Sequence, residues 1–383
     1  MRIEYTPEQA AFQARVRRFA DTVVVPRAAQ IDAEDVFPTE LVVDAARHGL
    51  LGVTLPVDVG GAGRDTVSYA LAIEAVSAAS ATLAVILTVQ NSLVAEVIHR
   101  FGTLAQQATW LRRLVSGEAI GAFALSEPNA GADAANQETL AVADGDDYRL
   151  TGHKVWVANG AVADVVLLFA ATEPHGGAKG ISAFLVPGVT PGLRRVGRRD
   201  SLGVRGLGCV DLELDAAVVG RDALVGAPGA GFRIALAALD RGRIAIGAQA
   251  LGVGGAAFEA ALAHARTRRT FGEPIGHHQA IQWMLADSAT ELAAARMLVL
   301  RAASAAEQQE RVILEAAMAK LSASEAAHRA ADRAMQVLAS AGYTRGSTVD
   351  RLYRDARATE IYQGTSEVQR MIIAEQVIGP AEP

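Results

Sequence analysis

The chain of 383 residues is long enough to form two or three domains, each with a hydrophobic core. Hydrophobic residues make up 51% of the sequence, charged residues 20% and aromatic residues 5%, and the abundant alanine favours helix. A net charge of −6 spread along the chain argues against nucleic acid as the main partner, despite 33 arginines beside three lysines.

Cysteine and histidine usage excludes several kinds of site. The single cysteine, Cys209, rules out an internal disulfide framework and any metal site built from several cysteines. The histidines are scattered, and His277-His278 has no partners at ligand spacing, so we expect no metal. We expect a cytoplasmic protein without a membrane span, because the N-terminus has no leader pattern and no apolar run reaches roughly 18 to 20 residues.

Helical periodicity predicts an N-terminal α-helical domain over residues 1–118. Thr6 and Gln9 match a capping box, which predicts the start of a first helix. This helix should extend to about Ile31, with Pro26 bending or breaking it. Further helices are expected over Thr39–His48, Thr66–Ala79, Leu83–Phe101 and Leu104–Ser116.

Glycines cluster at positions 60–63, after Leu55-Pro56. A phosphate cradle would need a preceding strand and a following Gly-Lys-Ser or Gly-Lys-Thr, and both are missing. We therefore interpret these glycines as a surface turn.

Residues 119–226 are expected to form a middle antiparallel β-barrel domain, because short β-branched or aromatic runs alternate with glycine, proline and aspartate. The predicted strands include Tyr148–Leu150, Val165–Phe169, Ile181–Pro187 and Val210–Leu214.

Residues 227–383 return to long alanine-rich helical patterns, which predict a C-terminal four-helix bundle. The glycines at 252–255 lie inside the first of these helices, so close helix packing explains them better than dinucleotide binding, which needs a strand-turn-helix context. Long helices are expected over Phe232–Thr267, Ala280–Ala305 and Glu307–Ala341.

Near the C-terminus, one amphipathic helix should run to about Tyr362 and stop at Gly364. A second helix should begin at once, with Ser366 and Gln369 as a capping box, and end at Gly379-Pro380. The junction between the two helices presents unpaired backbone N–H groups, a geometry suited to a phosphate or a flavin edge.

The segment RDARATEIYQGTSEVQR, residues 354–370, resembles the C-terminal signature of the acyl-CoA dehydrogenases, FAD enzymes that oxidise acyl thioesters between the α and β carbons. The resemblance extends from the first helix to about Ile378. It implies that reduced FAD passes electrons to an electron-transferring flavoprotein, and that the chain forms a homo-oligomer, a dimer or tetramer, with FAD near the subunit interface.

Two segments of the middle domain resemble the family's flavin-contacting strands, namely Phe123–Pro128 and Lys154–Asn159. In relatives the first meets the polar edge of the flavin, and a tryptophan matching Trp156 packs against the ring system. The family usually has a hydroxyl where Ala158 stands, and often a serine near the pantetheine arm where Ala132 stands. The resemblance implies cofactor contacts at Phe123, Leu125, Ser126, Trp156, Ala158, Arg268, Thr270, Phe271, Gln279, Gln336, Ser340, Thr365 and Glu367.

The turn Arg268–Gly272, followed by Gln279, resembles the family's segment for the adenosine and pyrophosphate of FAD, and arginine suits phosphate. In relatives a Gln-x-x-Gly-Gly loop of a partner subunit completes this site. Here the loop keeps Gln336 but replaces both glycines, the second by Ser340.

The main departure concerns the catalytic base. In short- and medium-chain members a glutamate at the position of Gln363 removes the α-proton, and in other members the glutamate stands at the position of Gly242. An amide cannot act as this base. By resemblance Tyr362 and Leu239 line the thioester pocket and Arg243 supports position 363. The implied substrate positions are Ala132, Leu239, Gly242, Tyr362 and Gly364.

The acids Asp240, Glu360 and Glu367 are near in sequence but are not convincing substitutes. Three explanations stay open: an engineered Glu-to-Gln change that traps substrate, a biosynthetic dehydrogenase of acyl-CoA or acyl-carrier-protein thioesters with displaced chemistry, or a non-catalytic flavin- and thioester-binding protein. The alternative catalytic hypothesis is a flavin oxidase or monooxygenase. We expect an FAD-dependent acyl-thioester dehydrogenase that pairs α-proton removal with hydride transfer to flavin N5.

Overall fold

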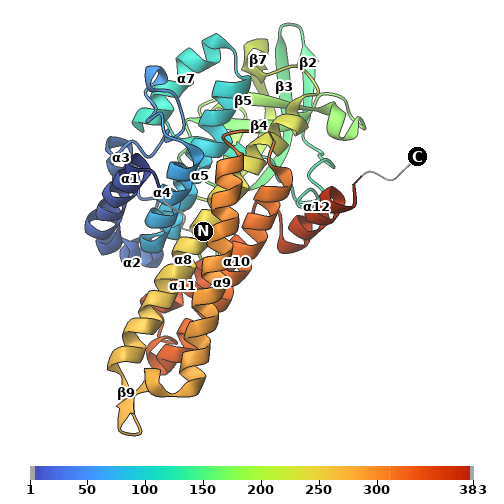
Figure 1. Cartoon of the computed structure of the whole chain (residues 1–383). Helices are drawn as coiled ribbons and strands as arrows, with labels where there is room; N and C mark the ends of the chain where they lie inside the picture. The colour runs from blue at the N-terminus through green and yellow to red at the C-terminus, as the bar shows by residue number, and fades with distance from the viewer. Residues whose placement is uncertain (1–4, 310, 380–383) are drawn as a thin grey trace.

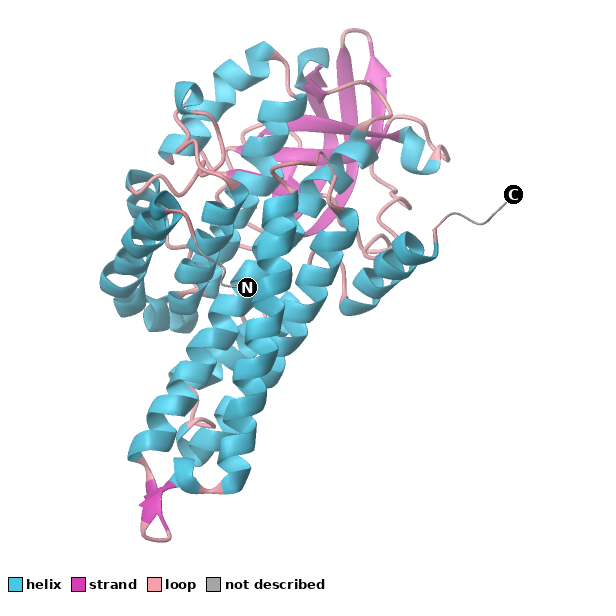
Figure 2. Cartoon of the chain, viewed as in Figure 1, coloured by secondary structure: helices cyan, strands magenta, loops and turns pink. Residues whose placement is uncertain are grey.

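The computed structural model describes residues 5–309 and 311–379 and has three parts (Figures 1 and 2). A group of N-terminal helices and a central sheet flank one end of a long C-terminal helix bundle. The predicted fold class, with helical, β and helical parts in this order, is confirmed.

The first helical segment is longer and more continuous than predicted. Helix α1 (Pro7–Phe19) begins at the predicted capping box, in which the Thr6 side chain accepts from Gln9 N and the Gln9 side chain caps Thr6 N. A π-helical turn (Ala20–Val24) then leads into α2 (Val25–Glu34). Pro26 lies in the first turn of α2, where its missing N–H removes no regular helical bond, so it does not break the path.

The other N-terminal helices follow the prediction, except that the one expected at Leu83 begins at Ala81 and contains a π-helical segment, Val89–Ala95. The glycines at 60–63 form the predicted turn, packed so closely on Leu55 that a Cβ at Gly61 would overlap its carbonyl. These helices are α3 (Thr39–Arg47), α4 (Thr66–Ala79), α5 (Ala81–Thr88), α6 (Glu96–Phe101) and α7 (Leu104–Ser116).

The middle part is one eight-stranded sheet in which most neighbouring strands are antiparallel. Two pairings are parallel: β1 runs along β4, and β2 meets β4 at a single register position, Leu140 opposite Ala171. The strand order is β6-β7-β3-β2-β4-β5-β8. The strands are β1 (Gly121–Ala124), β2 (Leu140–Asp144), β3 (Asp147–Val157), β4 (Val165–Ala171), β5 (Ile181–Pro187), β6 (Leu193–Arg198), β7 (Val210–Gly220) and β8 (Leu224–Val225).

Long helices form the C-terminal bundle, which ends in a small hairpin, β9 (Arg269–Thr270) and β10 (Glu273–Pro274), at the tip far from the sheet (Figure 1). The third long helix was predicted from Glu307 but begins only at Ile313. Close packing explains the glycines of the first helix, because a Cβ at Gly252 would overlap α4 at Ser77 and Glu74. The helices are α8 (Gly231–Thr267), α9 (Gln279–Ala305), α10 (Ile313–Leu338), α11 (Thr348–Thr359) and α12 (Ser366–Ile378).

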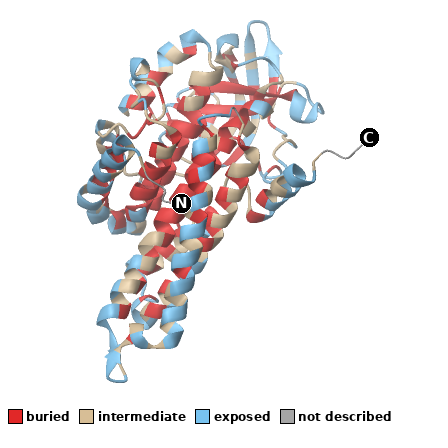
Figure 3. Cartoon of the chain, viewed as in Figure 1, coloured by how far each residue is buried: buried red, intermediate tan, exposed pale blue. Residues whose placement is uncertain are grey.

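Two helical stretches, Ala81–Phe101 and Gly231–Thr267, are long and apolar enough to cross a membrane, contrary to the expectation that no stretch is. However, 94% and 72% of their most apolar windows are buried inside the fold (Figure 3). Their apolar character is therefore explained by packing, since both helices contribute side chains to the hydrophobic core that joins the N-terminal helices to the bundle.

Candidate active site

The junction between α11 and α12 is a tight turn around Gln363. Helix α11 ends at Thr359, one turn earlier than predicted, and both Gln363 (φ 53°) and Gly364 (φ 95°) adopt left-handed backbone conformations. A left-handed glutamine is uncommon, so the surrounding structure must hold it there.

The predicted capping box at the start of α12 is wrong. Thr365, not Ser366, is the N-cap, and its hydroxyl accepts from Val368 N at 3.4 Å. Because Ser366 is already helical, its hydroxyl cannot cap the helix, and it is buried with no hydrogen-bond partner in the part of the chain that the structure describes. The Gln369 amide, free from a capping role, points back into the turn.

Three buried side chains hold the backbone carbonyls of this turn. Lys320 Nζ donates to Gly364 O at 2.8 Å, and Gln369 Nε2 donates to Gln363 O at 3.2 Å and Gly364 O at 3.0 Å. Arg243 Nε donates to Gln363 O at 3.4 Å. Lys320 was not predicted as a site residue, and Gln369 was predicted only as part of a capping box. The available signal was that Lys320 is one of only three lysines and lies within an alanine-rich helix.

The Gln363 side chain points at Gly242 on α8. A Cβ on Gly242 would overlap Gln363 Oε1, and it would lie 3.1 Å from Leu93 Cδ2. Gln363 Oε1 is buried and has no hydrogen-bond partner among the described residues. The two positions at which the resemblance places a catalytic glutamate are therefore in direct contact.

Arg243, predicted to support position 363, belongs to a buried charge cluster. Its guanidinium lies 3.1 Å from Asp240 Oδ1, and Asp240 Oδ2 accepts from Arg311 Nε at 2.7 Å. Burial lowers the pKa of Arg243 below its ordinary value, and Asp240 opposes this shift.

Two of the three acids considered as substitute bases are held by other side chains, and the third is exposed. Asp240 is shared by two arginines, and Glu360 is bound by Arg357 and by His328 Nδ1 at 3.0 Å. Glu367 is exposed on the first turn of α12.

The predicted pocket residues Tyr362 and Leu239 are partly buried and pack on the same hydrophobic cluster, to which Leu93 also belongs. Tyr362 donates its hydroxyl proton to Gln249 Oε1 at 2.9 Å, and burial raises its pKa above the ordinary value. Ala132 is exposed on the loop between β1 and β2.

The two predicted flavin segments of the sheet are adjacent. Val155 N donates to Ser126 O at 2.9 Å, which pairs the end of β3 with the segment after β1. Trp156 is 54% exposed, with φ 56°, and the Arg199 guanidinium lies 5.1 Å from its ring centroid. A half-exposed indole can pack on a planar ligand.

Other predicted cofactor residues of the sheet are more buried. Phe123 packs on Phe169 at 5.0 Å between ring centroids, and Ala158 is partly buried. The Leu125 carbonyl accepts from the wholly buried Lys154 Nζ at 3.2 Å. Lys154 also pairs with the buried Glu127 at 2.6 Å.

The remaining predicted cofactor residues lie at the opposite end of the bundle. Arg268, Thr270, Phe271 and Gln279 belong to the hairpin tip and the start of α9, and Phe271 is 98% exposed. Gln336 and Ser340 flank the end of α10, which packs beside this tip. Helix α8 packs on the sheet at Gly231, where a Cβ would overlap Ser182 of β5, and ends at Thr267 beside the tip. Along α8 the tip is therefore roughly 54 Å from this contact with the sheet, at about 1.5 Å of rise per residue. One chain therefore does not bring the two groups together.

The loop after α10 keeps a glycine-like backbone without glycine. Ala339, which follows Leu338, has φ 52° and ψ −131°, a combination that a side chain disfavours. Ala339 stands where the resemblance places the first glycine of the loop, and its backbone has a conformation typical of glycine.

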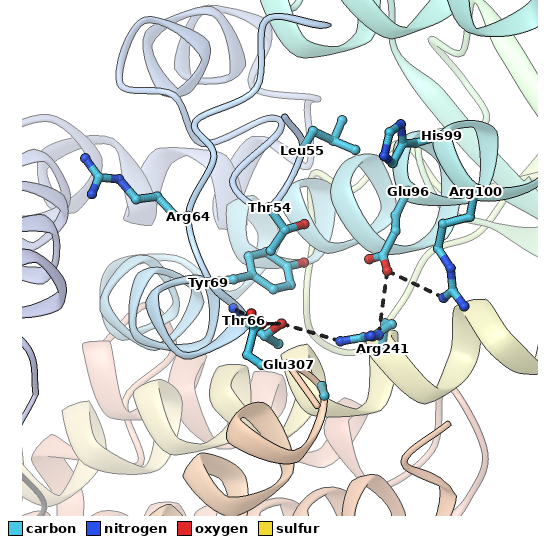
Figure 4. Close-up of a pocket in the computed structure, with 11 residues that line it drawn as sticks. Thr54, Leu55, Arg64, Thr66, Tyr69, Glu96, His99, Arg100, Arg241 and Glu307 are labelled. Atoms are coloured by element: carbon cyan, nitrogen blue, oxygen red, sulfur yellow. Dashed lines mark hydrogen bonds and ion pairs between the residues drawn. The ribbon is translucent and has the colours of Figure 1, made fainter. Parts of the chain in front are cut away.

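A separate polar cavity of about 210 Å³ lies between α4, α6, α8 and residues 306–307 (Figure 4). Arg241, the neighbour of Gly242, lies in its wall 3.6 Å from Glu96, and the Glu307 carboxylate accepts from Thr66 N at 2.7 Å. None of the predicted site residues lines this cavity, so it is distinct from the turn at Gln363.

Three family descriptions match successive parts of the sequence. Residues 6–118 match "Acyl-CoA dehydrogenase, N-terminal domain", residues 122–217 the middle domain and residues 229–378 the C-terminal domain.

Named relatives are similar along nearly the whole chain. The mitochondrial short-chain specific acyl-CoA dehydrogenase of Bos taurus is 45% identical over 358 residues, which are 94% of this chain and 87% of the relative. An acyl-CoA dehydrogenase of Bacillus subtilis is 43% identical over 375 residues, 98% of this chain and 99% of the relative.

Solved structures share the fold. Butyryl-CoA dehydrogenase from Megasphaera elsdenii superimposes with a TM-score of 0.96 at 35% identity, covering 99% of this chain and 100% of that one. A glutaryl-CoA dehydrogenase from Mycobacterium smegmatis, solved in complex with FADH2, gives 0.93 at 30% identity over 99% and 96% of the chains. The prolyl acyl carrier protein oxidase AnaB gives 0.94 at 29% identity over 98% and 100%.

Proposed function

Because the chain belongs to the acyl-CoA dehydrogenase family of oxidoreductases, we propose that it is an FAD-dependent acyl-thioester dehydrogenase in which Gln363 occupies the position of the base. The observation that carries this proposal is the meeting of Gln363 with Gly242. Positions 363 and 242, which can each hold the family's glutamate, are in contact, and neither carries a carboxylate.

The residues of the sheet fit the flavin part of FAD. The exposed face of Trp156 can pack on a planar ring system, and Ser126 and Ala158 lie on the segments beside it. When bound, FAD would supply the acceptor for a hydride from the β carbon. A relative of the same fold is described in complex with FADH2, which supports this cofactor.

The distance between the sheet and the bundle tip supports a second copy of the chain as partner. An extended FAD held at Trp156 would need Arg268, Thr270 and Gln279 from the tip of another subunit, because the chain's own tip is too far away. A dimer or tetramer with FAD near the interface would satisfy both groups of residues.

The chain's own residues position a thioester but do not remove its proton. Lys320, Gln369 and Arg243 fix the carbonyls of the turn, so the Gln363 amide has a defined direction. Loss of a positioned general base lowers a rate by roughly 10²- to 10⁴-fold. We therefore expect the chain to bind acyl thioesters and to oxidise saturated ones slowly. The carrier is coenzyme A or an acyl carrier protein, and the AnaB relative supports the second.

The test is an anaerobic titration of the FAD-loaded protein with saturated acyl-CoA and acyl-carrier-protein thioesters, followed by flavin absorbance. We expect each effective ligand to perturb the spectrum, with bleaching in Gln363→Glu and little in the chain as given. A protein that retains no FAD, or whose spectrum no thioester changes in either form, would contradict the proposal.

The same titration separates a non-catalytic function, and reoxidation of the reduced protein by oxygen separates an oxidase function. A non-catalytic flavin- and thioester-binding protein would show spectral perturbation in both forms and bleaching in neither. A flavin oxidase or monooxygenase would, once reduced by dithionite, react rapidly with oxygen, whereas a dehydrogenase that passes electrons to an electron-transferring flavoprotein would react slowly.

A further inference from the structure

Cations outnumber anions around the turn at Gln363. Lys320 has no exposed surface, and Arg243 is 4% exposed. Arg311 joins them through Asp240, which lies within ion-pair distance of both arginines, at 3.1 and 2.7 Å. The two arginines therefore share a single carboxylate, and Lys320 adds a third positive charge near the turn.

Among the described residues, Lys320 is the one of these three cations that contacts no carboxylate. Its one described hydrogen bond goes to the neutral carbonyl of Gly364 at 2.8 Å. Burial, and secondly the charge of Arg243, lower the pKa of Lys320 to about 8. A buried ammonium without a paired anion is costly, so nearby negative charge stabilises it.

The carboxylates slightly farther away do not supply that charge, because arginines and solvent neutralise them. Glu325 pairs with Arg370 at 2.7 Å, and Glu360 pairs with Arg357. Glu367 is exposed. They raise the pKa of Lys320 only as lesser influences than burial and Arg243.

Because the side chain at 363 is uncharged, it does not balance the excess of positive charge around the turn. A carboxylate at that position would place a negative charge on the turn whose backbone carbonyls, at residues 363 and 364, accept from Arg243 and Lys320. An amide supplies no charge, but its NH₂ group can donate to an anion that a glutamate would repel.

We infer, on the basis of the proposed function, that the missing negative charge arrives with the ligand: the preferred acyl thioester carries a carboxylate on its α or β carbon. In this arrangement the ligand carboxylate lies beside the Gln363 amide, which donates to it, and balances Lys320 and Arg243. The chain thus selects carboxylated acyl groups over apolar acyl groups of the same shape.

The test compares two nearly isosteric ligands by isothermal titration calorimetry on the FAD-loaded protein. Malonyl-CoA carries two carboxylate oxygens where isovaleryl-CoA carries two methyl groups. Malonyl-CoA has no hydrogen on the carbon next to Cα, so its binding is measured without turnover. We expect the chain as given to bind malonyl-CoA at least about tenfold more tightly, as one close charge pair at intermediate dielectric allows.

Gln363→Glu is the matched variant, since it changes charge with little change in shape. It should lose the preference or reverse it, while binding isovaleryl-CoA as before, when the FAD of both proteins is first reduced with dithionite so that isovaleryl-CoA is not oxidised. Lys320→Met, checked for folding by circular dichroism, should also weaken malonyl-CoA binding more than isovaleryl-CoA binding.

The outcomes separate this inference from the proposed function. Equal or tighter binding of isovaleryl-CoA by the chain as given would overturn the inference and leave the acyl-thioester function standing. Failure of both proteins to bind either thioester would overturn the proposed function, and the inference with it.

Discussion

Gln363 and Gly242 stand at the two positions where the family can carry its glutamate, and in this structure the two residues are in contact. The amide oxygen occupies the space that any side chain at 242 would need, with Leu93 packed beside it. A base restored at 242 would therefore collide with Gln363, whereas a glutamate at 363 has the shape of the residue already there. Under the proposed function, we therefore expect position 363 to be the place where a single substitution restores the base.

Substitution of Gly242 by alanine tests this contact. Overpacking a closed site costs about 1 to 3 kcal/mol, so we expect Gly242→Ala to lower the free energy of unfolding by that amount in urea denaturation. The control is Gly255→Ala in the same helix, where a Cβ meets nothing within 4 Å. It should be stabilising by up to about 1 kcal/mol, from helix propensity. A Gly242→Ala protein as stable as the control would show that Gln363 does not fill this space.

Lys320 gives the stability a distinctive pH dependence. Its pKa falls from 10.5 to about 8 in the folded protein, so between these values the unfolded chain binds more protons than the folded one. The destabilisation from the buried charge is complete below pH 8 and fades as the pH rises to 10.5.

We therefore expect the stability of the chain as given, relative to Lys320→Met, to rise between pH 8 and 10.5 by at most roughly 3 kcal/mol. Denaturation midpoints across this range provide the measurement. A stability difference from Lys320→Met that does not change with pH would mean that burial does not lower the pKa of Lys320.

At the scale of elements, a buried ion pair fixes the segment after β1. Lys154 on β3 lies 2.6 Å from Glu127, and Glu127 also accepts from the backbone N–H groups of Glu138 and Thr139, at 2.6 and 3.1 Å. The pair therefore anchors both ends of the loop that carries Ala132 and begins beside Ser126.

Lys154→Met would leave the Glu127 carboxylate buried without its cation. Removal of one partner from a buried pair costs about 3 to 5 kcal/mol, which we expect as a loss of unfolding free energy. Lys179→Met, on the surface turn before β5, is the control and should change stability by less than about 0.5 kcal/mol. Equal stability of the two variants would contradict the anchoring role.

Regular elements followed from sequence where local signals agreed with packing. Thr66–Ala79 and Leu104–Ser116 were predicted to the residue, because each has a side-chain cap and a continuous apolar pattern. The π-helical turns before Pro26 and at Val89–Ala95 were not predicted, since tertiary packing and not residue type decides where an extra residue enters a helix. The cap of α12 was misplaced by one residue because Thr365 and Ser366 are both good caps.

At the scale of the whole molecule, the site was predicted only in part. Family resemblance pointed to Gln363, Gly242 and Arg243, and the fold brings these three together. Lys320 could not be placed, because its approach to Gly364 depends on the packing of α10 against the turn before α12. The group at the bundle tip stays a prediction, since it needs a second copy of the chain to meet the sheet.

The exposed tip provides a test of that second copy. Phe271 is 98% exposed, so Phe271→Ser should leave the stability of a single chain nearly unchanged. If the tip completes a neighbour's FAD site, the variant should retain several-fold less FAD after gel filtration, and sedimentation should show weaker association. Leu104→Ser, at a position 84% exposed on α7, is the control. Unchanged FAD retention and association in Phe271→Ser would remove the tip from the cofactor site.

The most direct test of the account as a whole is the rate of flavin reduction after anaerobic rapid mixing with butyryl-CoA, measured for the chain as given and for Gln363→Glu. The account predicts that the glutamate variant is faster by roughly 10²-fold or more, because it alone has a carboxylate at the point where positions 363 and 242 meet. Equal rates in the two proteins would contradict it, and would mean that the base for this chemistry lies elsewhere in the fold.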